Sequence, residues 1–432
     1  MLFLTFAVAG SAFAEAEYDL LLKGGHVIDG KNRISAVRDV AIKDGRIAAV
    51  AADIPASRAL KTVDVSGLYV TPGLVDIHAH LYTGTGERGS YAGDNSVYPD
   101  GFTFRAGVTT VVDVGGAGWR NFEDFKDRVI DRSRTRVLAF INIVGHGMRG
   151  DSYEHELADM QVEPTAAMAL KHKGLIVGVK SAHYRGPEWD PYTRAVEVGQ
   201  RAGIPVMVDF GANRPERPLY DLLNKIFRPG DIYTHVYSGL RIEQDAETRG
   251  PSRALLDGRK RGILFDVGHG GGSFLWRVAA PLMKAGFVPD TISTDLHIGS
   301  MNTGMKDMLN VMSKFLAMGM PLEEVVPRGT WNPAKAIRQE QLGNLSPGSP
   351  ADIAVLGLER GEFGFLDING ARLKGNQRLR CELTLRDGKI VYDLNGRAGE
   401  DWDKLPADYK RVGDPRWDAY APRPRPRPGA KP

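Results

Sequence analysis

Two histidines, His78 and His80, stand one residue apart at the end of an apolar run that begins at Val70. Residues i and i+2 of a β-strand point to the same face, so we expect both imidazoles to project together from the end of a strand. Imidazole is a strong ligand for zinc-like metals. Buried histidines also serve as ordinary polar core residues, so the pair alone leaves both interpretations open.

Polar side chains end three further apolar segments: Lys180 in "LIVGVKSAH", His235 in "IYTHVYSG" and Asp295 in "TISTDLH". A lysine at such a position is costly to bury unless it is paired or chemically changed. Its options are a salt bridge to Asp113 or Asp209, a Schiff base, or a carbamate formed with carbon dioxide that bridges two metals. The surrounding histidines and aspartates favour the carbamate.

The elements that must position these residues are short apolar segments separated by helix-like stretches. Most of the segments are apolar on both faces, as strands of a parallel sheet are. Eight such strands alternating with helices predict an α/β fold of the (β/α)₈ TIM-barrel type, whose active sites lie at the carboxyl ends of the strands. The predicted strands are Tyr69–His80, Gly107–Gly115, Arg136–Val144, Gly174–His183, Gly203–Gly211, Asp231–Gly239, Gly262–Gly270 and Asp290–His297.

The flanks of this region have a different pattern. "DVAIKDGRIAAV" before it and "CELTLRDGKIVYD" after it alternate in the manner of antiparallel strands joined by D-G turns. We predict that residues 18–68 and 342–395 form one small β-sandwich assembled from both chain ends, around a hydrolase barrel at residues 69–341. Residues 396–432 form a Pro/Arg-rich tail, whose last stretch "YAPRPRPRPGAKP" we expect to be extended.

The amino terminus and the composition limit location and partners. An apolar run followed by Ala12-Phe13-Ala14 predicts a signal peptide at residues 1–14, although no Lys or Arg precedes the run; the mature protein would then be periplasmic or secreted. No later stretch is a candidate membrane span. The single cysteine, Cys381, excludes a disulfide within the chain. A net charge of only +3 argues against a nucleic-acid partner.

The combination of "GLVDIHAH", the lysine in "GVK", "THVYSG" and "STDLH", framed by a split β-sandwich, resembles the amidohydrolase superfamily. The resemblance covers roughly residues 18–395 and is nearest to the dihydroorotase-like and deacetylase-like branch, with its N-acetyl amino acid and acetyl hydroxy acid hydrolases. It implies that a first zinc-like ion is held by His78, His80, Asp295 and Lys180 as N6-carboxylysine. It also implies a second ion held by Lys180, His235 and a strand-five histidine.

Strand five departs from this pattern, because it reads "IPVMVDFG" and places Asp209 where the histidine is expected. Asp209 is either an oxygen ligand of the second ion, or a sign that the second ion is weak or absent. Two dications balance a carbamate, Asp209, Asp295 and a hydroxide, and a neutral site is cheaper to bury than a charged one. This count favours Asp209 as a ligand.

The mechanism implied by this site is hydrolysis by metal-activated hydroxide, with Asp295 as general base and then general acid. Arg149 and Arg185, on loops after the third and fourth strands, are candidates to grip a substrate carboxylate. His269, in a glycine-rich turn after strand seven, is a candidate to hydrogen-bond the substrate, and Ser273 is expected to cap the following helix.

The predicted function is therefore hydrolysis of a C–N amide bond in a small molecule that bears a carboxylate, with an acetyl ester as a further candidate substrate. A deaminase on the same fold is one alternative, which Lys180 argues against because deaminases of this superfamily typically use one ion and no bridging lysine. A non-catalytic barrel that serves as a binding module is another. The sequence is compatible with a homo-oligomer and does not fix the oligomeric state.

Overall fold

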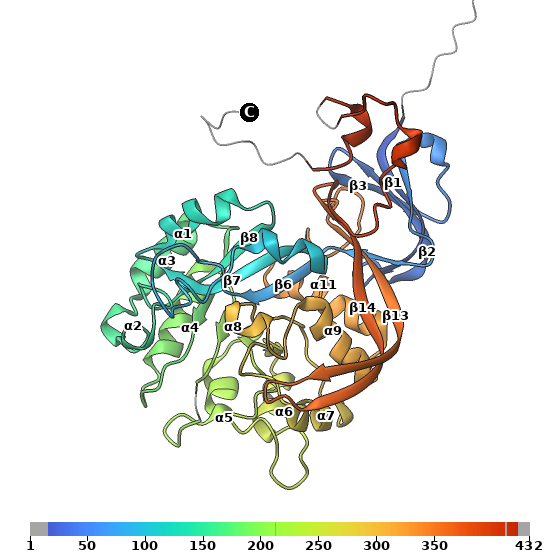
Figure 1. Ribbon diagram of the computed structural model, residues 1–432. Helices are drawn as coiled ribbons and strands as arrows, with labels where there is room; N and C mark the ends of the chain where they lie inside the picture. The colour runs from blue at the N-terminus through green and yellow to red at the C-terminus, as the bar shows by residue number, and fades with distance from the viewer. Residues whose placement is uncertain (1–15, 212, 411–412, 422–432) are drawn as a thin grey trace, which may run out of the picture.

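The structure is a computed structural model that describes residues 16–211, 213–410 and 413–421. The predicted signal peptide at residues 1–14 and the end of the predicted tail lie outside the described residues. No helix in the described part of the chain is long and apolar enough to cross a membrane. The structure consists of two sheets with helices packed mainly around the first (Figure 1).

The first sheet has seven parallel strands in the simple order β12-β11-β10-β9-β8-β7-β6. Six of the strands fall inside predicted segments and β7 runs three residues past its segment, to Gly118. Nearly all strand residues are buried, as sequences without polar alternation require. The carboxyl ends of all seven strands therefore lie at one edge. The strands are β6 (Leu74–Ala79), β7 (Val108–Gly118), β8 (Arg136–Asn142), β9 (Ile176–Ser181), β10 (Val206–Val208), β11 (Ile232–Tyr233) and β12 (Leu264–Phe265).

The eighth predicted strand, Asp290–His297, is not a regular strand. Single parallel bridges join Thr291 to Asp266, just after β12, and Leu296 to Ala79 at the end of β6. The segment thus lies between the two outer strands, and the His80 N–H donates to the Leu296 carbonyl at 2.8 Å. Regular pairing fails because Asp295 turns into the left-handed region at a φ of 51°. The result is a curled parallel sheet, with only isolated bridges across the last gap.

Eleven α-helices in the described residues connect and cover the strands. Helix α4 shows the local reasons for such an element: Tyr192, Ala195 and Val196 are buried at helical spacing, and Gly203 ends the helix at a φ of 69°. The helices are α1 (Phe122–Arg128), α2 (Asp151–Glu154), α3 (Val162–Lys171), α4 (Asp190–Ala202), α5 (Leu219–Asp221), α6 (Arg253–Lys260), α7 (Trp276–Lys284), α8 (Ile298–Met301), α9 (Met308–Ala317), α10 (Leu322–Arg328) and α11 (Trp331–Ala336).

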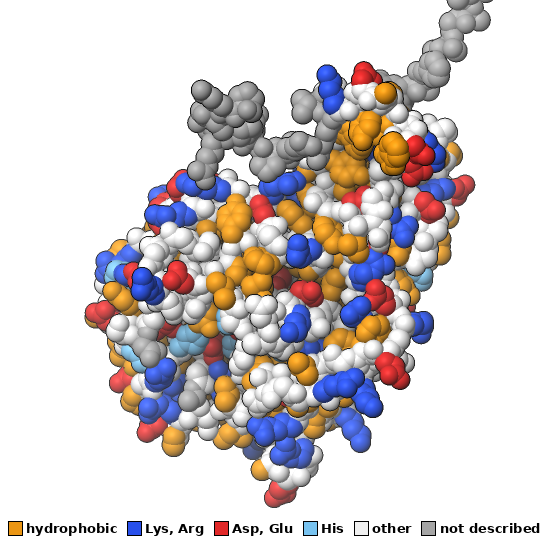
Figure 2. Space-filling model, in the orientation of Figure 1, with side chains coloured by type: hydrophobic (Ala, Val, Ile, Leu, Met, Phe, Trp, Pro, Cys, Tyr) orange, Lys and Arg blue, Asp and Glu red, His pale blue; other side chains and the backbone are white. Residues whose placement is uncertain are grey.

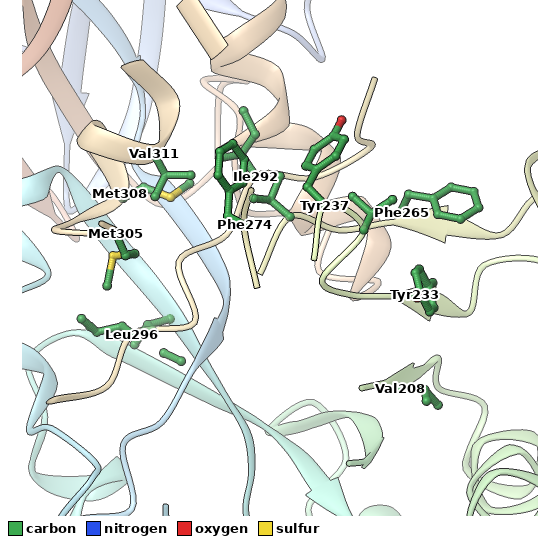
Figure 3. Packing of buried hydrophobic residues seen from close by; sticks show 14 of the residues in the cluster. Val208, Tyr233, Tyr237, Phe265, Phe274, Ile292, Leu296, Met305, Met308 and Val311 are labelled. Atoms are coloured by element: carbon green, nitrogen blue, oxygen red, sulfur yellow. The ribbon is translucent and has the colours of Figure 1, made fainter. Parts of the chain in front are cut away.

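The largest hydrophobic cluster packs the helices against the first sheet. Figure 3 shows part of it, where Phe274 and Ile292 lie near Tyr237, and Val311 and Met308 of α9 extend the same layer. Such close packing makes strand positions costly to change, since each buried side chain contributes roughly 1.5–3 kcal/mol. The polar residues at the strand ends are therefore held by a rigid apolar layer.

The second sheet is built from both ends of the chain, in the order β15-β14-β13-β5-β1-β2-β3, with β4 paired to β1. It differs from the predicted sandwich, because all eight strands form one connected mixed sheet. The sheet curls around a shared core, in which Leu20 and Val40 join Val355 and Leu383. Its strands are β1 (Tyr18–Asp29), β2 (Ile34–Lys43), β3 (Arg46–Ala51), β4 (Ala59–Asp64), β5 (Tyr69–Pro72), β13 (Ile353–Leu366), β14 (Arg372–Arg386) and β15 (Lys389–Asp393).

Strands β13 and β14 form a long hairpin that leaves this sheet and runs past α9 toward α7 (Figure 1). At its tip, an Asp367 carboxylate oxygen accepts a hydrogen bond from the Trp276 N–H at 3.2 Å. The Trp276 indole N–H donates to the carbonyls of Phe365 and Ala371, at 3.1 Å each. The prediction that Ser273 caps this helix is wrong, because α7 begins later, at Trp276, and the hairpin tip satisfies its first amide.

Candidate functional site

A cavity of about 360 Å³ opens at the carboxyl ends of the parallel strands. All six residues predicted as metal ligands line it, so the structure brings them together. His78 and His80 come from the end of β6 and the other four from separate segments, which meet here because the strands of the sheet run in the same direction. The lining is His78, His80, Tyr91, Met148, Lys180, His183, Asp209, His235, Gly271, Gly272, Ser273, Asp295, His297 and Gly299.

His78, His80 and Asp295 form the tightest group in this cavity. Each of them offers a ligand atom, and these atoms lie within 4.8 Å of one another. An Asp295 carboxylate oxygen is 3.0 Å from His80 Nε2 and 3.6 Å from His78 Nε2. The other ring nitrogen of His80, Nδ1, is buried and has no hydrogen-bond partner among the described residues. Two imidazoles and a carboxylate whose ligand atoms lie this close together suit a zinc-like ion.

Burial fixes the protonation of this group. It lowers the pKa of His78 to about 3, helped by the nearby Lys180, and it also lowers the pKa of His80. Burial alone would raise the pKa of Asp295, but the adjacent His78 and the hydrogen bond with His80 outweigh it and keep that pKa below its usual value. Neutral imidazoles and an ionised carboxylate are the forms that bind metals.

The polar groups behind His78 and His235 orient both rings. His78 Nδ1 lies 3.0 Å from Thr234 Oγ1 and 3.7 Å from a carboxylate oxygen of the buried Asp266. His235 Nδ1 lies 2.6 Å from the Gly268 carbonyl, to which it donates. Histidine ligands are typically held in this way, with one ring nitrogen bonded to the protein and the other turned to the site.

Lys180 has no carboxylate partner among the described residues. Its side chain is buried, and Nζ lies 3.4 Å from His78 Nε2 and 3.9 Å from the Met207 sulfur. The salt bridges considered for it, to Asp113 or Asp209, are absent from the ion pairs of the described residues. Burial lowers the pKa of this amine, which favours the neutral, nucleophilic form.

Both carboxylate oxygens of Asp209, by contrast, have polar neighbours. One carboxylate oxygen accepts from the Arg241 guanidinium and from the Gly211 N–H at 3.2 Å. The other lies 3.3 Å from His183 Nε2 and 3.4 Å from His235 Nε2. Burial would raise the pKa of Asp209, but Arg241 and His235 hold it well below its usual value.

His183 was not singled out by sequence reasoning, although it stands only three residues after Lys180. Its Nδ1 lies 2.6 Å from a carboxylate oxygen of Glu154, so both ring nitrogens face carboxylates. Burial would lower the pKa of His183, but the hydrogen bonds with Asp209 and Glu154 raise it to about 10. The ring is therefore a cation on the cavity wall.

Tyr91 was also missed, because nothing in the loop sequence around it indicates a site. Its ring centroid lies 4.3 Å from that of His80 and 5.1 Å from that of His297. His297 in turn caps the short helix α8 by accepting from the Gly299 N–H at 3.1 Å. The tyrosine therefore forms part of the cavity wall beside the metal-ligand candidates.

The three residues predicted to bind substrate are placed elsewhere. His269 is wholly buried outside the cavity lining, with Lys314 Nζ 2.5 Å from its Nε2 and its ring stacked on Phe274, so the structure argues against substrate contact. Arg149 pairs with Glu87 beside the cavity. Arg185 is exposed and does not line the cavity.

Comparison with known proteins places this geometry in a family. A sequence profile of the amidohydrolase family matches residues 276–391. A deacetylase of Agrobacterium fabrum is 34% identical over 359 residues, which cover 80% of this chain and 85% of that protein. A dihydroorotase of Anaeromyxobacter is 31% identical, over 88% of this chain and 99% of its own length.

Solved structures agree with these relatives. A crystal structure described as an adenine deaminase superposes with a TM-score of 0.79 at 29% identity, covering 87% of this chain and 100% of that one. A dihydroorotase crystal structure gives a TM-score of 0.74 at 29% identity, covering 87% and 99%. The chain therefore belongs to the amidohydrolase family and is a metal-dependent hydrolase that acts on carbon–nitrogen bonds.

Proposed function

We propose that the protein is a deacetylase-like enzyme that hydrolyses the amide of a small N-acyl compound bearing a carboxylate, at a zinc-like ion held by His78, His80 and Asp295. The observation that carries the proposal is the buried His78–His80–Asp295 group, whose ligand atoms lie within 4.8 Å of one another. Deacetylases that are 34% and 32% identical support the choice of reaction. When bound, the ion would acidify water and polarise the scissile carbonyl.

Asp295 is the proton carrier in this proposal. Its ionised carboxylate lies at the cavity, beside His80, and its positive φ of 51° turns the side chain out of the strand direction. It can take a proton from the attacking water and deliver it to the leaving nitrogen, which a poor amine leaving group needs. Gly270 allows this position, because a Cβ built there would lie 2.1 Å from an Asp295 carboxylate oxygen.

We propose that Lys180 reacts with carbon dioxide and becomes N6-carboxylysine, a further ligand of the ion. Its support is a buried amine beside His78 without an ion-pair partner in the described residues. Lys180→Ala should lose activity, and short carboxylic acids should partly restore it by replacing the carbamate. Labelled bicarbonate should give a carbamate carbon signal in wild-type protein, and a wild-type spectrum without that signal would contradict the modification.

The substrate carboxylate is proposed to approach His183. This side chain brings positive charge to the cavity wall, whereas Arg149 is paired with Glu87 and Arg185 lies outside the lining. A carboxylate at this place would meet a charged donor that is already oriented by Glu154. His183 thus replaces the two arginines as the proposed anchor.

An activity screen of metal-loaded protein tests the proposed reaction. The panel is N-acetyl and other N-acyl amino acids of both hands, cyclic amides, acetyl esters and amino-heterocycles. Release of carboxylate and amine from the acyl compounds supports the proposal. Ammonia release from the heterocycles alone would instead indicate a deaminase. One of the similar solved structures is described as an adenine deaminase. No turnover on any of them, together with no bound metal, would indicate a binding module.

The proposal also covers the closure of the barrel and the location of the protein. We propose that the segment after residue 290 closes the first sheet into a (β/α)₈ barrel, which its bridges to both outer strands support. We also propose a periplasmic or secreted location, for which the support is the signal-like sequence of residues 1–14. Cell fractionation with and without these residues tests the location.

A further inference from the structure

The strand-five side of the cavity contains a second set of ionisable groups, centred on Asp209. The family pattern implies a second ion there, so the question is whether Asp209 still has an oxygen to offer. Its first oxygen is taken by Arg241 and the Gly211 amide. Its second oxygen faces the ring nitrogens of His183 and His235 at 3.3 and 3.4 Å. The Arg241 guanidinium and the Gly211 amide donate to this carboxylate and His183 Nε2 faces it, whereas His235 donates from Nδ1 to Gly268 and has no proton on Nε2 to offer. Asp209 is therefore paired with Arg241 without a metal.

Arg241 is a fixed part of this arrangement. Its residue is only 3% exposed, and its Nε donates to the Gly211 carbonyl while Nη1 lies 3.3 Å from Ser238 Oγ. Its backbone N–H donates to the buried Glu243 carboxylate at 2.9 Å. Guanidinium stays charged at any physiological pH and binds carboxylates in a fixed orientation. Arg241 therefore holds a permanent positive charge against Asp209, where a second dication would add to it.

The two halves of the cavity differ in whether their charged side chains have ion-pair partners. The His78–His80–Asp295 half contains a buried lysine beside His78, Lys180, that has no ion pair among the described residues. In the part of the chain that the structure describes, it is also the one group of histidine, cysteine and acidic side chains with ligand atoms close enough for an ion. In the Asp209 half the carboxylate is paired with Arg241, and neither residue is among the buried unsatisfied side chains of the described residues.

We infer that Arg241 takes the electrostatic place of the second metal ion, so that the protein binds a single divalent ion per chain and Asp209 is an ion-pair partner rather than a ligand. This inference rests on the proposed metal-dependent hydrolysis and replaces the prediction that Asp209 holds a second ion. In this arrangement Arg241 occupies one oxygen of Asp209, and the other oxygen faces His183 Nε2 at 3.3 Å.

The test counts ions in the full-length chain. Protein loaded with excess zinc and bicarbonate is desalted, and its metal content is measured by elemental analysis. A second preparation is loaded with Mn²⁺ and its electron paramagnetic resonance spectrum is recorded, because two ions in one cavity are exchange-coupled and an isolated ion is not. The variants are Asp209→Asn, which keeps the side-chain size, and Arg241→Met, which removes the charge. His80→Asn is the control for the proposed ion.

The wild type and Asp209→Asn should each hold one ion with an uncoupled spectrum, and His80→Asn should lose it. Arg241→Met, if it folds, should gain a second ion and a coupled spectrum, because it frees the Asp209 carboxylate. Two coupled ions in the wild type, or loss of an ion in Asp209→Asn, would overturn the inference while leaving the proposed hydrolysis intact. A wild type that binds no ion would overturn the proposed function as well.

Discussion

Asp295 is the residue on which the proposed chemistry depends most. Asn has the same size and retains one oxygen for coordination, but it cannot carry a proton. Asp295→Asn should therefore fold and keep most of its metal, while kcat for an N-acyl amino acid falls by about 10²-fold or more. Steady-state kinetics and metal analysis of the same preparation measure both quantities.

The leaving group separates the two roles of Asp295. An activated aryl ester needs little protonation when its bond breaks, so the same variant should lose less activity on that ester than on the amide. An equal loss on both substrates would indicate a role as ligand only. A kcat close to that of the wild type on both would remove Asp295 from the mechanism.

His183 gives a pH dependence of stability. Its pKa is raised from an ordinary 6.5 to about 10 in the folded protein, against the effect of burial, by the hydrogen bonds with Asp209 and Glu154. Its contribution to stability is therefore complete below pH 6.5 and is lost as the pH rises through about 10. Between these values, His183→Asn should lose less unfolding free energy than the wild type.

Urea unfolding of both proteins at several pH values across this window measures the difference. The same substitution at His26, in the second sheet, controls for the loss of a histidine elsewhere in the chain. If the wild type and His183→Asn show parallel pH profiles, the ring is not held as a cation by its two carboxylates.

The metal-ligand candidates could be chosen from sequence because residues of metal-binding type stand at the ends of predicted strands. His78, Lys180, His235 and Asp295 each follow an apolar segment, and parallel strands bring such ends to one edge. His183 ends the same segment as Lys180 but was not chosen; it lies two residues beyond the end of β9, where a φ of 59° lets it face Asp209. The Arg241 partner of Asp209 is likewise a loop contact with no periodic signal.

At the scale of elements, the hairpin of β13 and β14 determines where α7 begins. The Asp367 carboxylate accepts from the Trp276 N–H and, on its other oxygen, from the amides of Asn369 and Ala371 at 2.9 Å each. Asp367→Ala should destabilise the protein by about 1–2 kcal/mol in urea, because the buried Trp276 N–H and the two loop amides lose their acceptor. Glu362→Ala, an exposed site on the same hairpin, should change stability by less than about 0.5 kcal/mol. Equal effects of the two substitutions would show that the hairpin tip does not cap the helix.

Local sequence could not reveal this cap, since Asp367 lies 91 residues from Trp276. It predicted Ser273 instead, the residue type that favours a helix start nearby. The eighth strand shows the same limit, because its apolar residues predict a strand but the Thr294 N–H bonds to the Asp76 carboxylate at 3.1 Å instead of a neighbouring strand. Tertiary partners distant in sequence decided both elements.

At the scale of the whole molecule, segments from both parts of the chain that flank the first sheet meet in the second sheet. The segment that follows the first sheet in sequence also contacts the first sheet. Arg136 of β8 pairs with Asp352, just before β13, which ties the two sheets together. Acidic and basic side chains are interspersed over the face shown in Figure 2, consistent with the small net charge and a small-molecule substrate. The cavity is thus supported by segments from nearly the whole chain.

The central claim is that the His78–His80–Asp295 group holds the metal that the hydrolysis needs. Crystals of zinc-loaded protein, with diffraction data collected at the zinc absorption edge, test it most directly. The account predicts an anomalous peak within bonding distance of all three side chains, about 2.0–2.2 Å from their ligand atoms. Zinc-loaded crystals with no peak between these three residues would contradict it.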